Sequence, residues 1–370
     1  MILFITYIIA LLYLIYLIWI SEPLFIKNKP NKKSYTPFVS IIISARNESD
    51  NIIELIDGLK NQKYPNTHFE IIIANDKSID DTFEKLSLME NKMDNLKVIN
   101  IQKTPIGWAS KKWALDNCIK KAKGEIILQT DADCIHRDNW ILDMIQPFEE
   151  ENTGFVAGPS YVGIKNNFWN ALLKLESIAQ ESFSYANSKR QLYLSCTARN
   201  IAFRKIVFQE IEGYNGISEI KSGDDDLLLH KIVTQTKWNI KYVANASTLV
   251  ASKAPKSIKS FYLQRLRYAS KGLIYYKIKT PNEVKIILPF LFITNLICAI
   301  SILNFINYQT IFWFIPIMIK SIGDIILISK YMSKIEIPLK ILYFIILMII
   351  HPFYIISIGG IAPFINVQWK

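Results

Sequence analysis

The chain reads Glu125-Ile126-Ile127-Leu128-Gln129-Thr130-Asp131-Ala132-Asp133 at the point that decides its fold class. A continuous apolar run of strand length that leads directly into acidic residues is typical of a buried strand in a parallel sheet. The same strand pattern occurs at Val39–Ser44, Glu70–Ala74 and Val98–Ile101, and helical patterns occur at Asn51–Lys60 and Trp113–Lys121. This alternation predicts an α/β fold with a Rossmann-like, mostly parallel sheet and helices on both faces.

Charged residues are distributed unevenly along the 370 residues, of which 51% are hydrophobic. Residues 1–20 carry no charge, 286–329 carry only Lys320 and Asp324, and 341–370 carry only Lys370. Apolar stretches of about 20 residues are long enough to cross a bilayer as helices. We therefore expect transmembrane helices at 1–21, 286–306, 309–329 and 339–359, a catalytic domain at 35–250, and membrane-interface helices at 251–282.

The formal net charge of +11 requires a partner, and the basic residues gather beside the apolar stretches. They are Lys27, Lys29, Lys32 and Lys33, then those of 253–285, and then the lysines of 330–340. Basic residues that flank spans mark the cytoplasmic side and attract anionic lipid. The pattern favours membrane lipid over nucleic acid as the partner. It predicts an integral protein of the cell inner or plasma membrane with a cytoplasmic catalytic domain, and an uncleaved first span rather than a signal peptide.

Two smaller features favour structural interpretations. The four cysteines include no C-x-x-C pair, so neither a disulfide framework nor a zinc site is expected. Lys320 and Asp324 are four residues apart at membrane depth, where charges are costly and usually paired. A structural ion pair is the simpler interpretation, and a polar lining of a lipid or glycan path is the alternative.

Polar, acid-bearing turns follow three of the predicted strands. They are Ser44-Ala45-Arg46-Asn47-Glu48, then 75–82, and then Thr130-Asp131-Ala132-Asp133-Cys134. Ligands bind parallel sheets outside the carboxyl ends of the strands, so these turns should converge on one crevice. Ser78 and Asp80 are equally well explained as ordinary helix caps.

Asp131 and Asp133 form the most specific of these patterns. Two carboxylates one residue apart in an extended segment point to the same side, and Mg²⁺ and Mn²⁺ take carboxylate, water and phosphate oxygens together. A metal held there can bridge the diphosphate of a nucleotide sugar and stabilise the departing charge.

Two further clusters each have two interpretations. Asp224, Asp225 and Asp226 are either a solvated helix start or include a general base that takes a proton from an acceptor hydroxyl. The segment Gln264–Tyr268 combines Gln264 and Arg267 with an aromatic ring, which suits diphosphate clamping and sugar stacking. A basic amphipathic helix on the membrane surface explains its charges, and those of Lys259, Arg265 and Lys271, equally well.

Together these segments resemble the family 2 glycosyltransferases, which have the GT-A fold, over residues 38–272. Val39–Glu48 looks like the opening strand and nucleotide loop, and Glu70–Thr82 like the D-D-G-S-T-D-G-T segment, with Lys77 where glycine is usual. Gly107–Ala114 is similar to G-W-x-G-K-x-W-A, with Ser110 for the glycine and Lys111 on the lysine. Asp131-Ala132-Asp133 matches the metal motif, and Gly223-Asp224-Asp225 takes the place of the catalytic E-D motif. Gln264–Tyr268 is similar to the Q-x-x-R-W motif of the membrane-embedded members, which include ceramide glucosyltransferase and polysaccharide synthases.

The resemblance implies an inverting, metal-dependent transfer of a sugar from a nucleotide-sugar donor, with a UDP-sugar favoured, to a hydroxyl of a lipid, lipid-linked or polysaccharide acceptor. Asp224, or Asp225 beside it, would be the base, and Asp131 and Asp133 would hold Mg²⁺ or Mn²⁺. The donor would contact Ala45, Arg46, Asn47, Glu48, Asp76, Lys111, Asp131, Gln264, Arg267 and Tyr268.

Three alternatives differ from this hypothesis in testable ways. A sugar-nucleotidyl transferase would carry a glycine- and arginine-rich loop after the first strand, where only Arg46 is found. A catalytically inactive glycan-binding scaffold would have lost a metal-site or base aspartate, and both are present. Processive polymer synthesis usually needs more spans than the three predicted after the catalytic domain, so transfer to a lipid or lipid-linked acceptor is favoured.

Overall fold

The computed structural model describes residues 2–26 and 35–364, which divide into two compact units. The sheet unit comprises residues 30–164 and 195–253, and the helical unit comprises 1–29, 165–194 and 254–370. Lys27, Lys29, Lys32 and Lys33, which contribute to the predicted orientation, lie outside the described residues. Residues 165–194 fall within the predicted catalytic range but group with the helical unit, a difference that the sequence pattern did not indicate.

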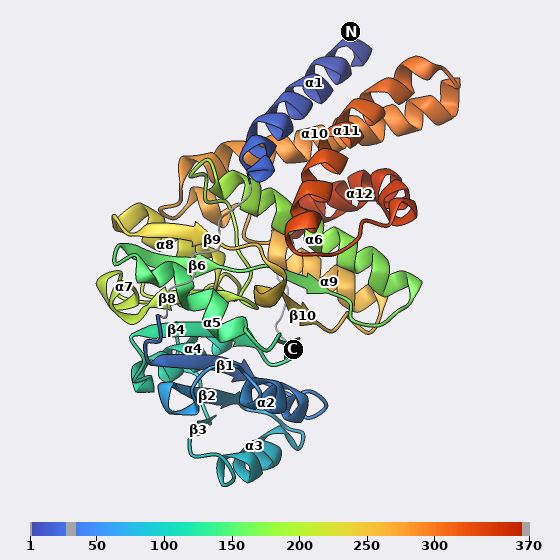
Figure 1. Cartoon of the computed structure of the whole chain (residues 1–370). Coiled ribbons are helices and arrows are strands. Elements are labelled where there is room, and N and C mark those ends of the chain that lie inside the picture. Colours follow the sequence, from blue (N-terminus) through green and yellow to red (C-terminus); the bar gives the residue numbers. More distant parts are fainter. Residues whose placement is uncertain (1, 27–34, 365–370) are drawn as a thin grey trace. The chain divides into compact units, whose positions relative to one another are not determined.

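The sheet unit is built on a seven-stranded sheet with the order β3-β2-β1-β4-β8-β6-β9 (Figure 1). The strands are β1 (Val39–Ala45), β2 (Phe69–Asp76), β3 (Leu96–Ile101), β4 (Ile126–Asp131), β6 (Thr153–Ala157), β8 (Ile201–Arg204) and β9 (Asn239–Tyr242). All neighbouring pairs are parallel except those of β8, which runs against both β4 and β6. The four predicted strands are β1 to β4, and the mostly parallel sheet is confirmed.

A second, three-stranded sheet and six helices complete the unit. The short strands pair in the order β5 (Cys134–Ile135), β10 (Val250–Ser252) and β7 (Ser160–Val162). The helices are α2 (Ile52–Lys60), α3 (Thr82–Glu90), α4 (Ser110–Lys121), α5 (Trp140–Ile145), α7 (Lys205–Glu210) and α8 (Asp226–Gln235). The predicted boundary at residue 250 cuts through β10, so the sheet unit extends slightly further than expected.

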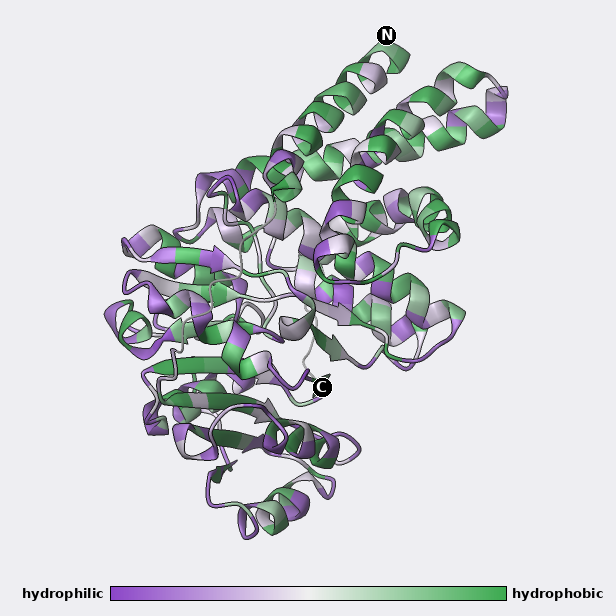
Figure 2. Cartoon of the chain, in the orientation of Figure 1, coloured by the Kyte–Doolittle hydropathy of each residue, from purple (hydrophilic) through white to green (hydrophobic). Residues whose placement is uncertain are grey.

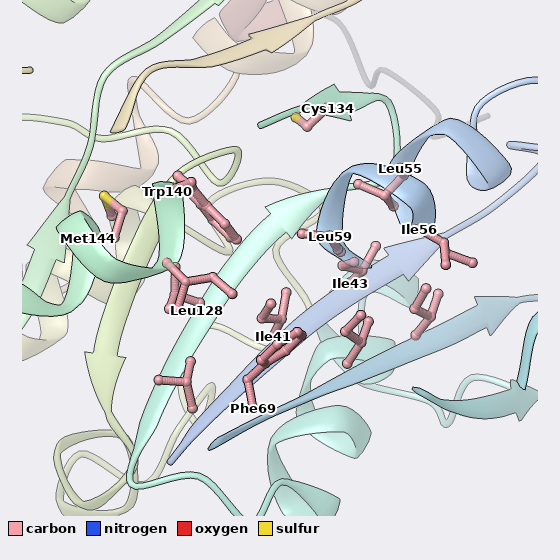
Figure 3. Close-up of a cluster of buried hydrophobic side chains, with 14 of the residues drawn as sticks. Ile41, Ile43, Leu55, Ile56, Leu59, Phe69, Leu128, Cys134, Trp140 and Met144 are labelled. Carbon is pink, nitrogen blue, oxygen red and sulfur yellow. The ribbon is translucent and has the colours of Figure 1, made fainter. Parts of the chain in front are cut away.

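The core explains why the apolar runs fold in this way. Alternate residues of β1, such as Ile41 and Ile43, pack with Leu55 of α2 and Trp140 of α5 on one face (Figure 3). The other face is covered by α4, which packs on β1, β2 and β3 and buries Leu115. Because both faces are covered, the central strands are apolar throughout, as in other buried parallel sheets.

In residues 2–26 and 35–364, the helical unit contains four long apolar helices that meet the length and composition of membrane spans. They are α1 (Ile2–Ser21), α10 (Asn282–Tyr308), α11 (Ile311–Lys334) and α12 (Ile341–Ile361), joined in the unit by α6 (Phe168–Ser188) and α9 (Ile258–Ala269). Figure 2 shows hydrophobic residues along the whole length of the four helices. The four predicted spans therefore correspond to four helices long enough to cross a bilayer.

Polar contacts occur inside this bundle of helices. Lys320 and Asp324 of α11 form an ion pair of 2.7 Å, and the Tyr13 hydroxyl of α1 donates to Asp324 over 2.7 Å. The paired arrangement agrees with the structural interpretation of these two charges, because each charge has a partner of opposite sign on the same helix.

Candidate active site

The carboxyl ends of three parallel strands lie side by side in the sheet unit. Ser44 pairs with Ala74 of β2 on one side and with Asp131 of β4 on the other. The turns after these strands therefore start at one edge, as the sequence predicts. This edge is where parallel sheets bind their ligands.

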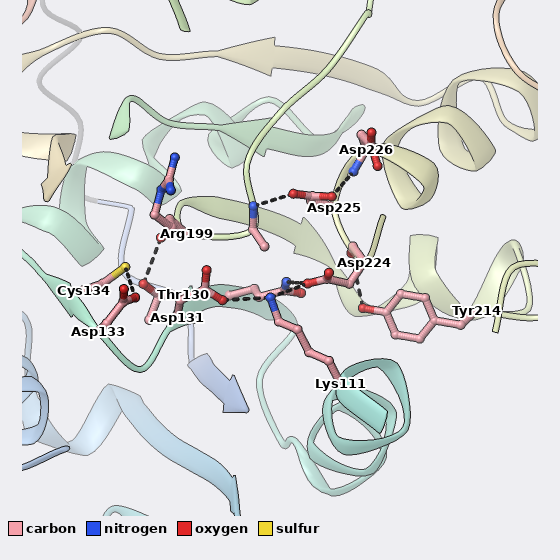
Figure 4. A network of polar contacts seen from close by, with 12 residues as sticks. Lys111, Thr130, Asp131, Asp133, Cys134, Arg199, Tyr214, Asp224, Asp225 and Asp226 are labelled. Atoms are coloured by element: carbon pink, nitrogen blue, oxygen red, sulfur yellow. Dashed lines mark hydrogen bonds and ion pairs between the residues drawn. The ribbon is translucent and has the colours of Figure 1, made fainter. Parts of the chain in front are cut away.

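Lys111, in the first turn of α4, joins two carboxylates from distant parts of the chain (Figure 4). Its Nζ lies 2.9 Å from Asp131 Oδ1 and 2.8 Å from Asp224 Oδ2. Gln129 of β4 also donates to Asp224 Oδ2, over 3.1 Å. The predicted metal residue Asp131 and the predicted base Asp224 thus belong to one cluster.

The cluster is held in its charged form by mutual attraction. Burial opposes the charge of Lys111, but Asp131 and Asp224 outweigh burial and hold the pKa of Lys111 well above its usual value. Burial alone would raise the pKa of Asp224, but the ion pair and hydrogen bond with Lys111 lower it below the usual value. Asp224 is therefore a carboxylate at neutral pH, the form in which it can accept a proton.

The Asp131-x-Asp133 motif does not lie in one extended segment, and that prediction is wrong. Asp131 is the last residue of β4, and Ala132 and Asp133 form a turn before β5. Asp133 accepts a 3.8 Å contact from the Cys134 thiol, whereas Asp131 contacts Lys111. The strand ends there because the chain reverses into β5, which pairs with β10.

The two aspartates still suit a hard divalent cation. Burial, and then the charge of Asp131, raise the pKa of Asp133 to about 6, which indicates negative charge that is only partly balanced. Among the residues described, no cluster of three or more histidine, cysteine, aspartate or glutamate side chains could hold a metal. Mg²⁺ is commonly bound by one or two carboxylates together with substrate phosphates and water, so a pair of aspartates fits such a site.

Asp224 and Asp225 differ clearly in their surroundings. Asp225 is the N-cap of α8, and its two oxygens accept from the backbone N–H of Asp226 (2.7 Å) and of Ala198 (2.9 Å). Gly223 precedes them with φ of +81°, and a Cβ there would lie 2.5 Å from Leu227. A helix start and a tight turn therefore account for Gly223 and Asp225, and Asp224 is left facing Lys111.

The loop after β1 is fixed by the loop after β2. The backbone N–H groups of Asn47, Glu48 and Ser49 donate to the side chains of Ser78 (3.0 Å), Thr82 (2.8 Å) and Asp80 (3.2 Å). Asp80 Oδ1 also accepts from the backbone of Thr82, at the start of α3. Ser78 and Asp80 thus hold the loop after β1, and their interpretation as ordinary helix caps is wrong, because the N-cap of α3 is Asp81.

Arg46 stands out in this loop. In residues 2–26 and 35–364 its guanidinium makes no hydrogen bond or ion pair, and its Nε is buried without a partner. Ala45 before it is buried at the end of β1. A guanidinium left unpaired beside the strand ends is suited to a phosphate group, which arginine binds through charge-assisted hydrogen bonds.

Asp76 lies at the end of β2 and is almost fully buried. Its Oδ1 accepts from the Ser110 hydroxyl over 2.7 Å and lies 3.2 Å from Lys77 Nζ. Lys77 has φ of +55°, a left-handed conformation that favours glycine. The structure therefore explains why glycine is usual at this position of the family pattern.

The Gln264–Tyr268 segment lies on α9 of the helical unit, so the proposed donor contacts of Gln264, Arg267 and Tyr268 remain predictions. The guanidinium of Arg267 lies 5.1 Å from the centre of the Tyr268 ring. Arg265 is buried and forms an ion pair with Glu176 of α6. The membrane-surface interpretation is therefore wrong for Arg265, and Lys271 is buried as well.

Several residues of the site carry no local sequence signal. Gln129 reads as part of an apolar strand, and Thr130 donates to the Arg199 carbonyl (2.8 Å), far along the chain. Tyr214 is buried with its hydroxyl 3.4 Å from the Asp224 carbonyl. Their roles depend on long-range contacts, which the local sequence does not show.

This fold and site define a class of protein: an α/β protein with an acidic centre at the carboxyl edge of a mostly parallel sheet, where such sheets bind their ligands. Residues 40–212 match the model of glycosyl transferase family 2. The chain thus carries a family 2 glycosyltransferase domain, as its sequence motifs indicate.

Named relatives match this chain over limited lengths. A beta-monoglucosyldiacylglycerol synthase of Nostoc sp. is 34% identical over 134 residues, which are 36% of this chain and 28% of the relative. A poly(ribitol-phosphate) beta-glucosyltransferase of Bacillus spizizenii is 37% identical over 95 residues, 26% of this chain and 14% of the relative. The chain therefore matches well under half the length of these two relatives.

The fold also has a solved counterpart. A mannosyltransferase of Pyrobaculum calidifontis, solved in complex with GDP-Man and Mn²⁺, superposes with a TM-score of 0.61 at 15% identity. The match covers 98% of this chain and 99% of the other. At this low identity the similarity establishes a shared fold, including the GT-A domain.

Proposed function

We propose that the chain transfers a sugar, with inversion, from a nucleotide-sugar donor to a hydroxyl group of a lipid or lipid-linked acceptor at the cytoplasmic face of a membrane. The observation that carries this proposal is the position of Lys111, whose Nζ contacts both Asp131 and Asp224. Lys111 thereby holds Asp131, which suits the diphosphate end of the donor, close to Asp224, which suits deprotonation of an acceptor hydroxyl.

The reaction is a single displacement at the anomeric carbon. Asp224 takes the proton of the acceptor hydroxyl, and the hydroxyl oxygen forms a bond to the anomeric carbon. The bond from that carbon to the diphosphate oxygen breaks, and its electron pair leaves with the nucleoside diphosphate. A base positioned in this way typically contributes about 10²–10⁴-fold in rate.

The other site residues act by binding and charge. Arg46 and Lys111 would contact the diphosphate, where their positive charges stabilise the negative charge that develops on departure. Asp131 and Asp133 would hold Mg²⁺ or Mn²⁺, which when bound neutralises charge on the leaving diphosphate. Little covalent work falls to the protein, so most of the acceleration comes from positioning and electrostatic stabilisation.

Two observations support a lipid acceptor. Four helices long enough to span a membrane accompany the catalytic domain in the same chain. One relative is named for the synthesis of a monoglucosyldiacylglycerol, which is a lipid. A lipid acceptor is the one that a membrane-spanning enzyme meets without a separate binding module.

A substrate screen tests the proposal. The purified full chain is incubated with Mn²⁺, a panel of nucleotide sugars and a membrane lipid extract, and the products are identified by mass spectrometry. We expect one donor to release its nucleoside diphosphate and to add a hexose to one lipid class. Release of the nucleoside diphosphate without any glycosylated lipid would contradict the lipid acceptor, and no release from any donor would contradict the transferase itself.

A further inference from the structure

Gln129 is a buried amide at a position where its neighbours in the sheet are apolar. It follows the apolar run 126–128 of β4, and across the sheet it pairs with Ile42 of β1 and Ile201 of β8. Its side chain is fully buried. A polar group buried in this way lowers stability unless all of its hydrogen bonds are made, so its presence in the strand needs a cause.

In the part of the chain that the structure describes, only one end of the Gln129 amide is paired. Its Nε2 donates to Asp224 Oδ2 over 3.1 Å, whereas its Oε1 is buried without a hydrogen-bond partner. This orientation follows from chemistry, because an ionised carboxylate only accepts hydrogen bonds and therefore faces the NH₂ end of an amide. An apolar side chain of similar length would avoid the unpaired oxygen, so the stability of the sheet does not explain a glutamine here.

The direction of the Gln129 side chain connects it to the rest of the site. Residues two apart in a strand face the same side of the sheet, so Gln129 and Asp131 share a face, whereas Leu128 packs in the core cluster on the other. Figure 4 shows Lys111 between Asp131 and Asp224, with which it forms ion pairs. Because Gln129 also contacts Asp224, the network that starts on β4 at Asp131 returns to β4 two residues earlier.

The two carboxylate oxygens of Asp224 have different surroundings. Lys111 Nζ and Gln129 Nε2 both contact Oδ2, over 2.8 Å and 3.1 Å. Within residues 2–26 and 35–364, no other residue donates a hydrogen bond to Oδ1. Two donors on one oxygen restrict the rotation of the carboxylate, and they leave the second oxygen available to accept a proton.

We propose that Gln129 is a positioning residue for the base, which holds Oδ2 of Asp224 so that Oδ1 faces the hydroxyl group of the acceptor. This inference rests on the proposed function, because it concerns the same proton transfer. In this role Gln129 touches neither the donor nor the acceptor and acts through Asp224 alone. Its loss should therefore slow the chemical step and leave donor binding unchanged, because misalignment of a base lowers the rate of reaction rather than the affinity for the donor.

A matched pair of variants, Gln129→Met and Gln62→Met, tests the proposal in the purified full chain in detergent. Gln62 is also a buried glutamine of the sheet unit, but both ends of its amide are paired, with the Arg137 carbonyl and the Ile141 N–H. Transfer is measured with Mn²⁺, a membrane lipid extract and tritiated UDP-glucose, UDP-N-acetylglucosamine or GDP-mannose, as the radiolabel that enters the lipid fraction. Melting temperatures are measured on the same samples.

The two variants should show opposite patterns. For Gln129→Met we expect kcat to fall about 10- to 100-fold, with the KM for the donor within about twofold of the wild type and the melting temperature not lowered. For Gln62→Met we expect a lower melting temperature, because two buried backbone groups lose their partners, and a kcat close to that of the wild type.

A kcat of Gln129→Met within about twofold of the wild type would overturn the positioning role. A fall in its melting temperature as large as that of Gln62→Met would overturn it as well, because Gln129 would then be a structural residue. Both results would leave the transferase intact. If the wild type transfers sugar from none of the three donors, that result contradicts the proposed function and this inference with it.

Discussion

At the scale of single residues, the site depends on a few charges that compensate one another. Lys111 is the central cation, and Asp131 and Asp224 are held on either side of it. Asp133 lies outside this balance, since burial and Asp131 raise its pKa to about 6. Removing one of these charges should therefore weaken the binding of a ligand or metal more than it lowers the stability of the fold.

Asp133→Ala tests the metal site at this scale. We expect the variant to lose Mn²⁺ binding, measured by electron paramagnetic resonance, and to lose transfer activity, while its melting temperature stays close to that of the wild type. Asp138→Asn, which changes an exposed aspartate paired with Lys63, is the control and should bind Mn²⁺ normally. Full activity of Asp133→Ala, or of the wild type in EDTA, would exclude the metal role.

Because His136 is buried, we expect the free energy of unfolding to depend on pH in the acidic range. Its Nε2 lies 2.8 Å from Thr130 Oγ1, its ring packs on Trp140, and burial lowers its pKa to about 3. In the unfolded chain the imidazole binds a proton near pH 6.5, so between about pH 6.5 and about pH 3 the unfolded state binds more protons. This contribution to stability is therefore complete above about pH 6.5 and is lost as the pH falls toward 3.

His136→Gln cannot take up that proton. Its melting temperature should fall less steeply than that of the wild type when the pH is lowered from about 7 to about 5. His68→Gln, at an exposed position, should keep the wild-type slope. Parallel melting curves of wild type and His136→Gln across this range would show that the imidazole does not titrate on unfolding.

The sequence indicated most of the charged residues of the site but not their pairing. Asp131, Asp224 and Lys111 each lie in a motif with a recognisable pattern, so each could be named in advance. Lys111 contacts one carboxylate that lies 20 residues further along the chain, Asp131, and another that lies more than 100 residues further along, Asp224. The sequence motif names Asp224 first as the base and Asp225 beside it, and the structure adds a physical reason, because Asp225 is the N-cap of α8 and accepts from the backbone of Ala198.

At the scale of elements, α9 carries two arginines with different surroundings. Arg265 is buried against Glu176, a contact that fixes α9 to α6. Arg267 lies two residues on, beside the Tyr268 ring, and is only partly buried. α9 thus carries one arginine with a structural role, Arg265, and a second, Arg267, that the resemblance assigns to nucleotide binding.

Arg267→Lys separates charge from geometry. Lysine keeps the positive charge that attracts anionic lipid but cannot reproduce bidentate contacts to phosphate. We expect activity to fall by at least about two orders of magnitude, which corresponds to about 2.7 kcal/mol of transition-state binding, with membrane association unchanged. Lys259→Gln, on an exposed part of the same helix, is the control and should remain near wild type. If Arg267→Lys keeps nearly full activity, Arg267 does not grip the nucleotide, and Gln264–Tyr268 is only part of a membrane-associated helix.

The predictability of the elements followed their length and periodicity. β1 to β4, α2, α4 and the four long helices were predicted because continuous apolar runs and helical periods are strong signals. β5, β7 and β10 have only two or three residues each, too few to show a period. The reversed direction of β8 and the membership of α6 in the helical unit depend on tertiary packing, which no local pattern reveals.

At the scale of the whole molecule, the order of segments predicts the membrane topology. Among the described residues, one candidate span precedes the sheet unit and three follow the final segment of that unit along the chain. With the lysines of 330–340 on the cytoplasmic side, the connection between α10 and α11 must lie on the opposite side. Both connections can be labelled, because Gln309 and Glu336 are exposed and have similar left-handed backbone angles.

Single cysteines at these two positions test the topology. Gln309→Cys should react with a membrane-impermeant thiol reagent in intact cells, and Glu336→Cys should react only after the membrane is opened. The described cysteines are buried and give a low background. The opposite labelling pattern would place the catalytic domain on the side away from cytoplasmic nucleotide sugars.

The central claim is that Asp224 deprotonates the acceptor in a transfer that uses a nucleotide sugar. Its most direct test is the rate at which radiolabelled sugar from the donor enters the lipid fraction, measured side by side for the purified wild type and Asp224→Asn. The account predicts that Asp224→Asn loses about 10²–10⁴-fold in this rate, while it binds the nucleoside diphosphate with near wild-type affinity. A rate within a few-fold of the wild type would contradict the account.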